Sequence, residues 1–100
     1  MKEKVTPSFV TVPPAFAREL KFFGETFLGG CIPDGEGENV LVAFKEYEGE
    51  HFAVSITFLY LMSVENNGKL KNLVGGPFRL PRNDEERNRL IYSYANGADL

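Results

Sequence analysis

The stretch from His51 to Val64, HFAVSITFLYLMSV, constrains the fold more than any other part of the chain, because it is the longest apolar-rich segment. Its even-numbered residues are all large and apolar, whereas its odd-numbered residues are small or polar until Leu59 and Leu61. Successive side chains of an extended chain point to opposite faces. The alternation therefore predicts a long strand in the middle of a sheet, with one face fully covered. The other face is where we expect another chain to pack, at Ala53, Ser55 and Thr57.

Length and composition predict a single domain, residues 1–100, that folds without metal or disulfide. The apolar share of 43% and the nine phenylalanines are sufficient for one core, since burying one Phe stabilises by roughly 1.5–3 kcal/mol. Cys31 is the only cysteine, which excludes an intramolecular disulfide and a cysteine-rich zinc site. We expect residues 1–7 to form a flexible arm. Without a signal-peptide core or a run of about 20 apolar residues, the chain is expected to be a soluble cytoplasmic protein with no membrane contact.

The first third of the chain predicts a strand followed by a helix. Residues 8–12 (SFVTV) have strand composition, and two prolines end that strand. Residues 15–27 then carry apolar side chains at helical spacing, namely Phe16, Leu20, Phe23 and Phe27. Gly24 interrupts this run, so residues 25–31 are open to two interpretations, a continued helix or a further short strand.

The middle of the chain predicts an antiparallel meander. Four glycines and a proline make residues 29–39 a loop. Residues 39–47 have the alternation of a strand, and a turn at 48–50 joins it to the segment that begins at His51. Asn67-Gly68 is a strong hairpin signal that would return the chain into a strand over 69–74. That strand would bend at 75–77.

The last element is predicted to be a helix with a defined start. Asn83 is a good N-cap, and Glu86 stands three residues later, where it can close a capping box. The buried stripe of this helix would be Leu90, Ile91, Tyr94 and Ala95. We therefore predict an α+β domain, with an antiparallel β-meander of three to five strands and two helices packed mainly on one face.

Charge is unevenly distributed along a chain whose net charge is −3. Eight acidic residues and one basic residue lie between Glu25 and Glu65, whereas six basic and three acidic residues lie between Asn66 and Arg89. Such asymmetry can steer a charged partner, although solvated loops and helix ends account for the same residues. The candidate partner-binding residues are Arg79, Arg82, Arg87, Arg89, Glu36, Glu38, Glu46, Glu48, Glu50, Ser55 and Thr57.

No group of residues forms a catalytic or cofactor-binding motif. A nucleophilic pair of Cys31 and His51 would lie in an acidic region that opposes a thiolate. The acidic loop at 34–38 lacks the length and ligand order of an EF-hand, and its carboxylates would repel a phosphate. We therefore expect no enzymatic activity, no cofactor and no metal.

Residues 10–25, VTVPPAFARELKFFGE, resemble the strand–proline–helix–Gly-acid pattern of the AbrB-type swapped-hairpin DNA-binding domains. The matching positions are Val10, Thr11, Val12, Pro13, Phe16, Leu20, Gly24 and Glu25. The sequence departs from that pattern in mid-helix, where Ala17 takes the place of the usual basic residue. The resemblance implies a DNA-binding dimer, such as a regulator or an antitoxin.

These observations predict a non-enzymatic binding or regulatory module that acts through protein–protein contacts, with a homodimer as one form of it. One alternative is the DNA-binding dimer that the resemblance implies, with the basic residues on phosphates. Another alternative is an acidic inhibitor that occupies a basic site on a nucleic-acid enzyme through residues 36–50.

Overall fold

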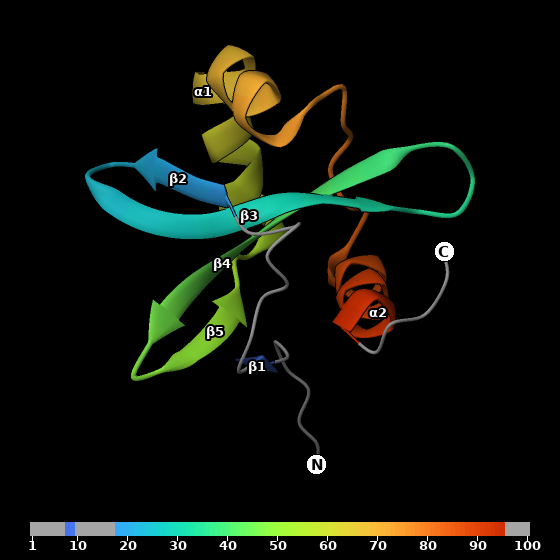
Figure 1. Ribbon diagram of the computed structural model, residues 1–100, viewed down its shortest axis with the longest axis horizontal. Helices are drawn as coiled ribbons and strands as arrows, with labels where there is room; N and C mark the ends of the chain where they lie inside the picture. Colours follow the sequence, from blue (N-terminus) through green and yellow to red (C-terminus); the bar gives the residue numbers. More distant parts are fainter. Residues whose placement is uncertain (1–7, 10–17, 96–100) are drawn as a thin grey trace.

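The computed structural model describes residues 8–9 and 18–95. In chain order the elements are β1 (Ser8–Phe9), β2 (Arg18–Phe22), β3 (Glu25–Pro33), β4 (Asn39–Tyr47), β5 (Glu50–Ala53), α1 (Ile56–Val74) and α2 (Asp84–Ala95). The strands form one antiparallel sheet in the order β1-β5-β4-β3-β2 (Figure 1). The predicted α+β class with an antiparallel meander is confirmed.

Strand β4 is the centre of the molecule, because its residues from Val40 to Phe44 are buried on both faces. Leu41 and Ala43 belong to a core cluster with residues of α1, whereas the alternate positions of β4 belong to a second cluster with residues of α2. Since alternate residues of a strand point to opposite faces, the two helices cover opposite faces of β4. Figure 1 shows α1 above and α2 below the ribbon of β3 and β4. The sequence had indicated two helices packed mainly on one face. The helices lie instead on opposite faces.

The stretch from His51 to Val64 is not a long strand. Strand β5 ends at Ala53, and α1 begins at Ile56. Seven of the nine residues from Ile56 to Val64 are apolar, so a stripe at helical spacing is available as well as the alternation, and α1 uses that stripe to cover the sheet. The predicted polar face is therefore absent. Ala53 is buried with α2, Ser55 caps α1, and Thr57 lies exposed on the first turn of the helix.

The hairpin predicted at Asn67-Gly68 and the strand predicted over 69–74 are also wrong. Both segments belong to α1, which is interrupted at Asn66 by non-helical backbone angles, φ −128° and ψ 23°. The interruption divides α1 into two helical segments, so three helical segments follow the strands. The helix ends at Gly75, whose left-handed φ of 80° suits glycine and whose N–H donates to Lys71 O at 2.9 Å.

The helix predicted over residues 15–27 is a β-hairpin where the structure describes it. Strands β2 and β3 flank a two-residue turn at Phe23 and Gly24, whose φ values are 53° and 75°. Leu20 and Phe22 then point to the same face and are both buried, as period-two spacing requires. The alternative of a strand over 25–31 is confirmed, and β3 extends to Pro33, which shortens the following loop.

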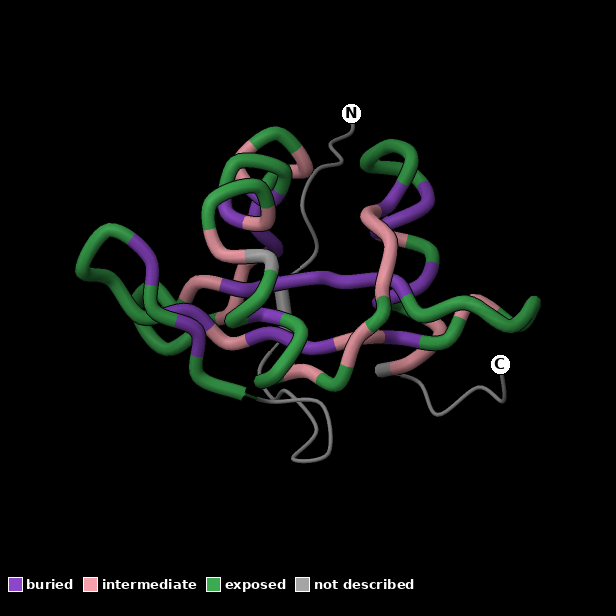
Figure 2. Tube along the Cα trace, turned by 90° about the horizontal axis from the view of Figure 1, so that it is seen from above, coloured by how far each residue is buried: buried purple, intermediate pink, exposed green. Residues whose placement is uncertain are grey.

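Two further predictions are confirmed. The strand over 39–47 has the bounds of β4, and its turn into β5 lies at Glu48 and Gly49. Asn83 caps α2, since its Oδ1 accepts the N–H of Glu86 at 2.8 Å. The predicted arm at 1–7, most of the strand at 8–12 and the stop of the last helix at 96–97 lie outside the described residues. Figure 2 shows buried residues along the middle of the sheet and exposed residues on the outer turns of both helices.

Candidate partner-binding surface

The first half of α1 is fixed on the sheet by its cap and by its inner side chains. Ser55 Oγ accepts the N–H of Phe58 at 3.2 Å, which satisfies one of the free donors at the helix start. Leu59 and Met62 are almost completely buried in the core that α1 forms with the sheet. The rings of Phe58 and Phe22 form a T-shaped contact at a centroid separation of 5.4 Å. These contacts determine which side of α1 faces solvent.

The solvent-facing side of this half-helix is apolar and carries no charge. From Ile56 to Val64 there is no Asp, Glu, Lys or Arg. Tyr60 and Val64, one turn apart, are 58% and 61% exposed, and Leu61 beside them is 48% exposed. A surface helix normally carries charged residues on its outer side, and a helix that is apolar all round is normally buried. This segment carries no charge on any side, yet Tyr60, Leu61 and Val64 are exposed to water.

A groove runs between this side of α1 and the segment that leads to α2. One hollow of about 390 Å³ is lined by Ser63, Val64, Phe78 and Leu80. A second hollow of about 310 Å³ is lined by Ile56, Thr57, Tyr60, Leu80 and Pro81. Leu80 lines both hollows, so they adjoin. We call this set of residues the α1 groove. Its lining is uncharged and mixed: the hollow beside Tyr60 is mainly apolar, whereas polar atoms make up more of the hollow beside Ser63. The sequence-predicted Thr57 is part of this lining.

The far wall of the groove is held in place by backbone hydrogen bonds to β4. Arg79 N donates to Asn39 O at 2.9 Å, and Leu41 N donates to Arg79 O at 2.9 Å. Because Arg79 lies between Phe78 and Leu80, both of these apolar side chains turn toward the core under α1. The groove is thus built on a sheet rather than on a free loop.

The side chain of Arg79 joins three separate parts of the chain on the other side of this segment. Its guanidinium donates to Glu86 through Nη1 at 3.1 Å and Nη2 at 2.7 Å. It also contacts Glu38 Oε1 at 2.8 Å and Asp34 Oδ2 at 3.2 Å. Glu86 accepts in addition from the backbone N–H of Arg82 at 2.7 Å. The network connects the β3–β4 turn, the groove wall and the start of α2.

The network favours the charged form of each of its members. The hydrogen bonds from Arg79 lower the pKa of Glu86 to about 2, with help from the Arg82 backbone N–H and against the effect of burial. The backbone N–H of Glu36 is the main cause that lowers the pKa of Asp34. The acceptor contacts raise the pKa of Arg79. All three groups therefore stay charged near neutral pH, and the groove wall remains fixed.

The predicted basic cluster is not one surface. Arg79 is held by the network, and the side chain of Arg87 is only 3% exposed, with Nη1 donating to Val54 O at 3.1 Å. Arg82 and Arg89 are exposed and line a hollow of about 440 Å³ at the start of α2, together with Glu85 and Glu86. The carboxylates in that hollow oppose phosphate binding.

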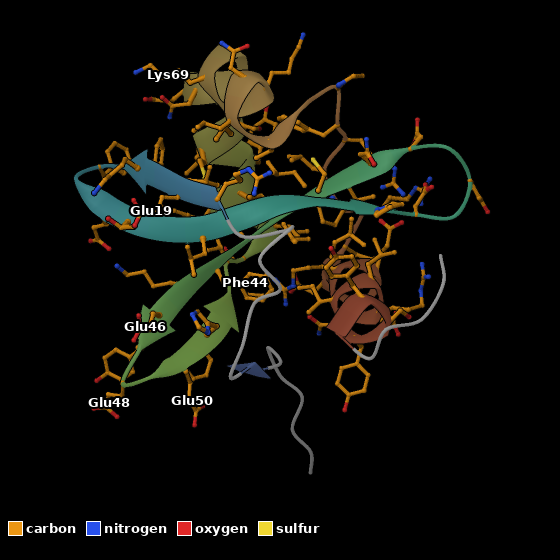
Figure 3. All side chains as sticks on the ribbon, in the orientation of Figure 1. Glu19, Phe44, Glu46, Glu48, Glu50 and Lys69 are labelled. Carbon is orange, nitrogen blue, oxygen red and sulfur yellow. The ribbon has the colours of Figure 1, made fainter. Side chains whose placement is uncertain are left out.

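The acidic residues of 36–50 form two groups at opposite ends of β4. Glu36 and Glu38 precede the strand, and the other three lie at its end. Nine extended residues span about 26 Å, so the two groups are far apart. Figure 3 shows Glu46, Glu48 and Glu50 together at the turn between β4 and β5, where all three are exposed. The single acidic face expected over residues 36–50 is therefore absent.

The structure does not bring the candidate nucleophilic pair together. Cys31 pairs with Leu41 and His51 pairs with Glu46 in the sheet, so the two residues lie on opposite faces. Burial raises the pKa of the Cys31 thiol to about 11, which makes it a poor nucleophile. Among residues 8–9 and 18–95, no three His, Cys, Asp or Glu side chains gather as metal ligands. No helix in the described ranges combines the length and apolar character needed to cross a membrane.

Sequence reasoning missed the α1 groove because it placed Ile56 to Val64 in a sheet. The signal that could have found it is the absence of charge over nine residues after a capping serine. Comparison with known protein families, characterised proteins and solved structures found no match to this chain. The resemblance of residues 10–25 to AbrB-type domains requires a helix where the structure has strand β2, so this resemblance no longer supports the DNA-binding alternative.

Proposed function

We propose that this protein is a non-enzymatic binding module that holds a partner protein in the α1 groove. The observation that supports this proposal is the uncharged, half-exposed outer side of α1, at Tyr60, Leu61 and Val64. A partner that buries such side chains gains roughly 25 cal/mol of binding free energy for each Å² of apolar surface removed from water. A cytoplasmic setting belongs to the same proposal and is supported by the single cysteine.

The shape and chemistry of the groove favour an apolar segment of the partner. Two adjoining hollows separated by Leu80 can each receive one large apolar side chain. The hydroxyl groups of Thr57, Ser63 and Tyr60 provide the polar contacts that fix orientation at such sites. An amphipathic helix, whose apolar residues recur about once per turn along one side, is a segment of this kind.

The proposal is tested by capturing partners from source cells with the wild-type protein and with two variants. Val64→Glu places a charge in the groove without removing a core side chain, and it should abolish capture. Tyr92→Ala is the matched control, because Tyr92 is 62% exposed and belongs to α2, which covers the opposite face of β4. Circular dichroism confirms that both variants fold. Equal capture by Val64→Glu and wild type would contradict the proposal.

A second candidate is suggested by the acidic turn between β4 and β5. Glu46, Glu48 and Glu50 are exposed there beside the exposed ring of Tyr47, a combination that suits a basic partner. This retains the inhibitor alternative with a smaller surface than the sequence indicated. Changing the three glutamates to glutamine should then abolish capture that Val64→Glu leaves intact, and the opposite pattern excludes this candidate.

A further inference from the structure

Strand β2 is an edge of the sheet. In the order β1-β5-β4-β3-β2, its only strand neighbour among the described residues is β3. An edge strand presents a row of backbone N–H and C=O groups that can pair with another strand. Its inner side chains, Leu20 and Phe22, are covered by α1, so the edge itself is the surface at issue.

The turn geometry shows which backbone groups of β2 face outward. Phe22 and Glu25 are paired across the two-residue turn. In such a hairpin the closing pair exchanges both hydrogen bonds, and hydrogen-bonded pairs alternate along the ladder. Residues 18, 20 and 22 therefore bond to β3. The N–H and C=O groups of Glu19 and Lys21 point away from it.

These outward groups restrict how a second copy of β2 could pair with the first. In an antiparallel pair related by a two-fold axis, outward residues must face outward residues. Three registers satisfy this near the middle of the strand. One places Glu19 opposite its own copy, one places Lys21 opposite its own copy, and one places Glu19 opposite Lys21.

The charges of β2 select one of the three registers. Like charges directly opposite each other destabilise a strand pair, whereas opposite charges stabilise it. Only the register with the two-fold axis at Leu20 pairs each Glu19 with the Lys21 of the second copy. Both residues are exposed on the same face of the sheet, and Lys21 Nζ already contacts Thr26 on that face at 2.9 Å. The charge pattern blocks the other registers and favours this one.

We propose that this protein forms a homodimer through antiparallel pairing of β2 with β2 of a second copy, centred on Leu20. Glu19 and Lys21 form two equivalent charge pairs, and their outward backbone groups extend the sheet across the two-fold axis. The dimer leaves the α1 groove to a different partner, so it does not depend on the proposed function.

The experiment measures the mass of the full chain by sedimentation at low ionic strength, where exposed charges are least screened. The wild type should give twice the chain mass of 11.2 kDa. Glu19→Lys and Lys21→Glu each turn both charge pairs into like-charge pairs, so each variant should raise the dissociation constant about tenfold or more. The double variant Glu19→Lys/Lys21→Glu restores opposite charges and should dimerise again.

Mixing the two single variants gives the sharpest outcome. Each is self-repelling, but a heterodimer of the two has opposite charges at both pairs and should form with twice the chain mass. The Val64→Glu variant should sediment with the same mass as the wild-type dimer. The proposal is overturned if the wild type is a monomer at every concentration, if the single reversals keep the wild-type mass, or if neither the double variant nor the mixture restores the dimer.

Discussion

The pair of leucines in the first half of α1 provides a direct test of its helical structure. Leu59 is completely buried, whereas Leu61 is 48% exposed. In a strand these two residues would point to the same face and contribute alike, but in a helix they lie about 200° apart. Replacing each with alanine therefore distinguishes the two structures by one comparison.

The expected effects differ in size. Leu59→Ala leaves a cavity in the core, and such changes cost about 2–5 kcal/mol, so we expect about 3 kcal/mol. Leu61→Ala removes a side chain that is half in water already, and we expect about 1 kcal/mol or less. For a domain of this size, 1 kcal/mol lowers the melting temperature by about 4–8 °C. Leu59→Ala should thus lower it by about 12–24 °C.

Thermal and urea unfolding, followed by circular dichroism, measure both variants against the wild type. The slope of the urea transition should stay constant, so that the shift in midpoint reports stability alone. Equal losses at Leu59 and Leu61 would refute the helix. A larger loss at Leu61 would mean that the outer side of α1 is not the exposed side.

Three further predictions concern other parts of the fold. A Cβ at Gly29 would lie 2.8 Å from Val42 O, so Gly29→Ala should destabilise by about 1–3 kcal/mol in urea unfolding, and a neutral effect would contradict the close strand packing. Because the folded-state pKa of Glu86 is lowered from 4.5 to about 2, its stabilisation is complete above pH 4.5 and is lost as the pH falls towards 2. The loss is roughly 3 kcal/mol at most, and a Glu86→Gln variant that shows the same acid-dependent loss would exclude this cause. Ser55→Ala removes the cap of α1 and should cost about 1 kcal/mol in thermal unfolding, whereas an unchanged melting temperature would place the helix start elsewhere.

The elements that the sequence predicted correctly are flanked by turn residues at both ends. Strand β4 lies between the glycine-rich loop and the turn at Glu48 and Gly49, and its predicted bounds were correct. The cap of α2 at Asn83 was also predicted, because a side-chain acceptor before three acidic residues is a local signal. Such local chemistry does not depend on what packs nearby.

The sequence failed where apolar residues fit two periods at once. In the stretch from Ile56 to Val64 almost every position is apolar, so alternation and helical spacing are both satisfied. Packing decides between them, since α1 must cover one face of β4 and no other described helix covers it. Similarly, Leu20 and Phe27 fit a helical stripe, but they face each other across the hairpin of β2 and β3.

The partner-binding face predicted from the sequence depended on placing this stretch in a strand. Thr57 was singled out as part of a polar sheet face, but it belongs to α1 and lines the α1 groove. Long-range ion pairs were invisible in the same way, because Arg79 and Asp34 are separated by 45 residues in the sequence. Only the fold shows that Arg79 supports the groove wall rather than offering its charge to a partner.

The central claim is that the α1 groove holds an apolar segment of a partner protein, and calorimetric titration of the captured partner tests it most directly. We predict that the wild type binds with a negative heat-capacity change, the mark of apolar burial. Val64→Glu should weaken binding by about 100-fold or more, since it places an unpaired charge in the interface, while Tyr92→Ala should bind like the wild type. Equal affinities for Val64→Glu and the wild type would contradict the claim.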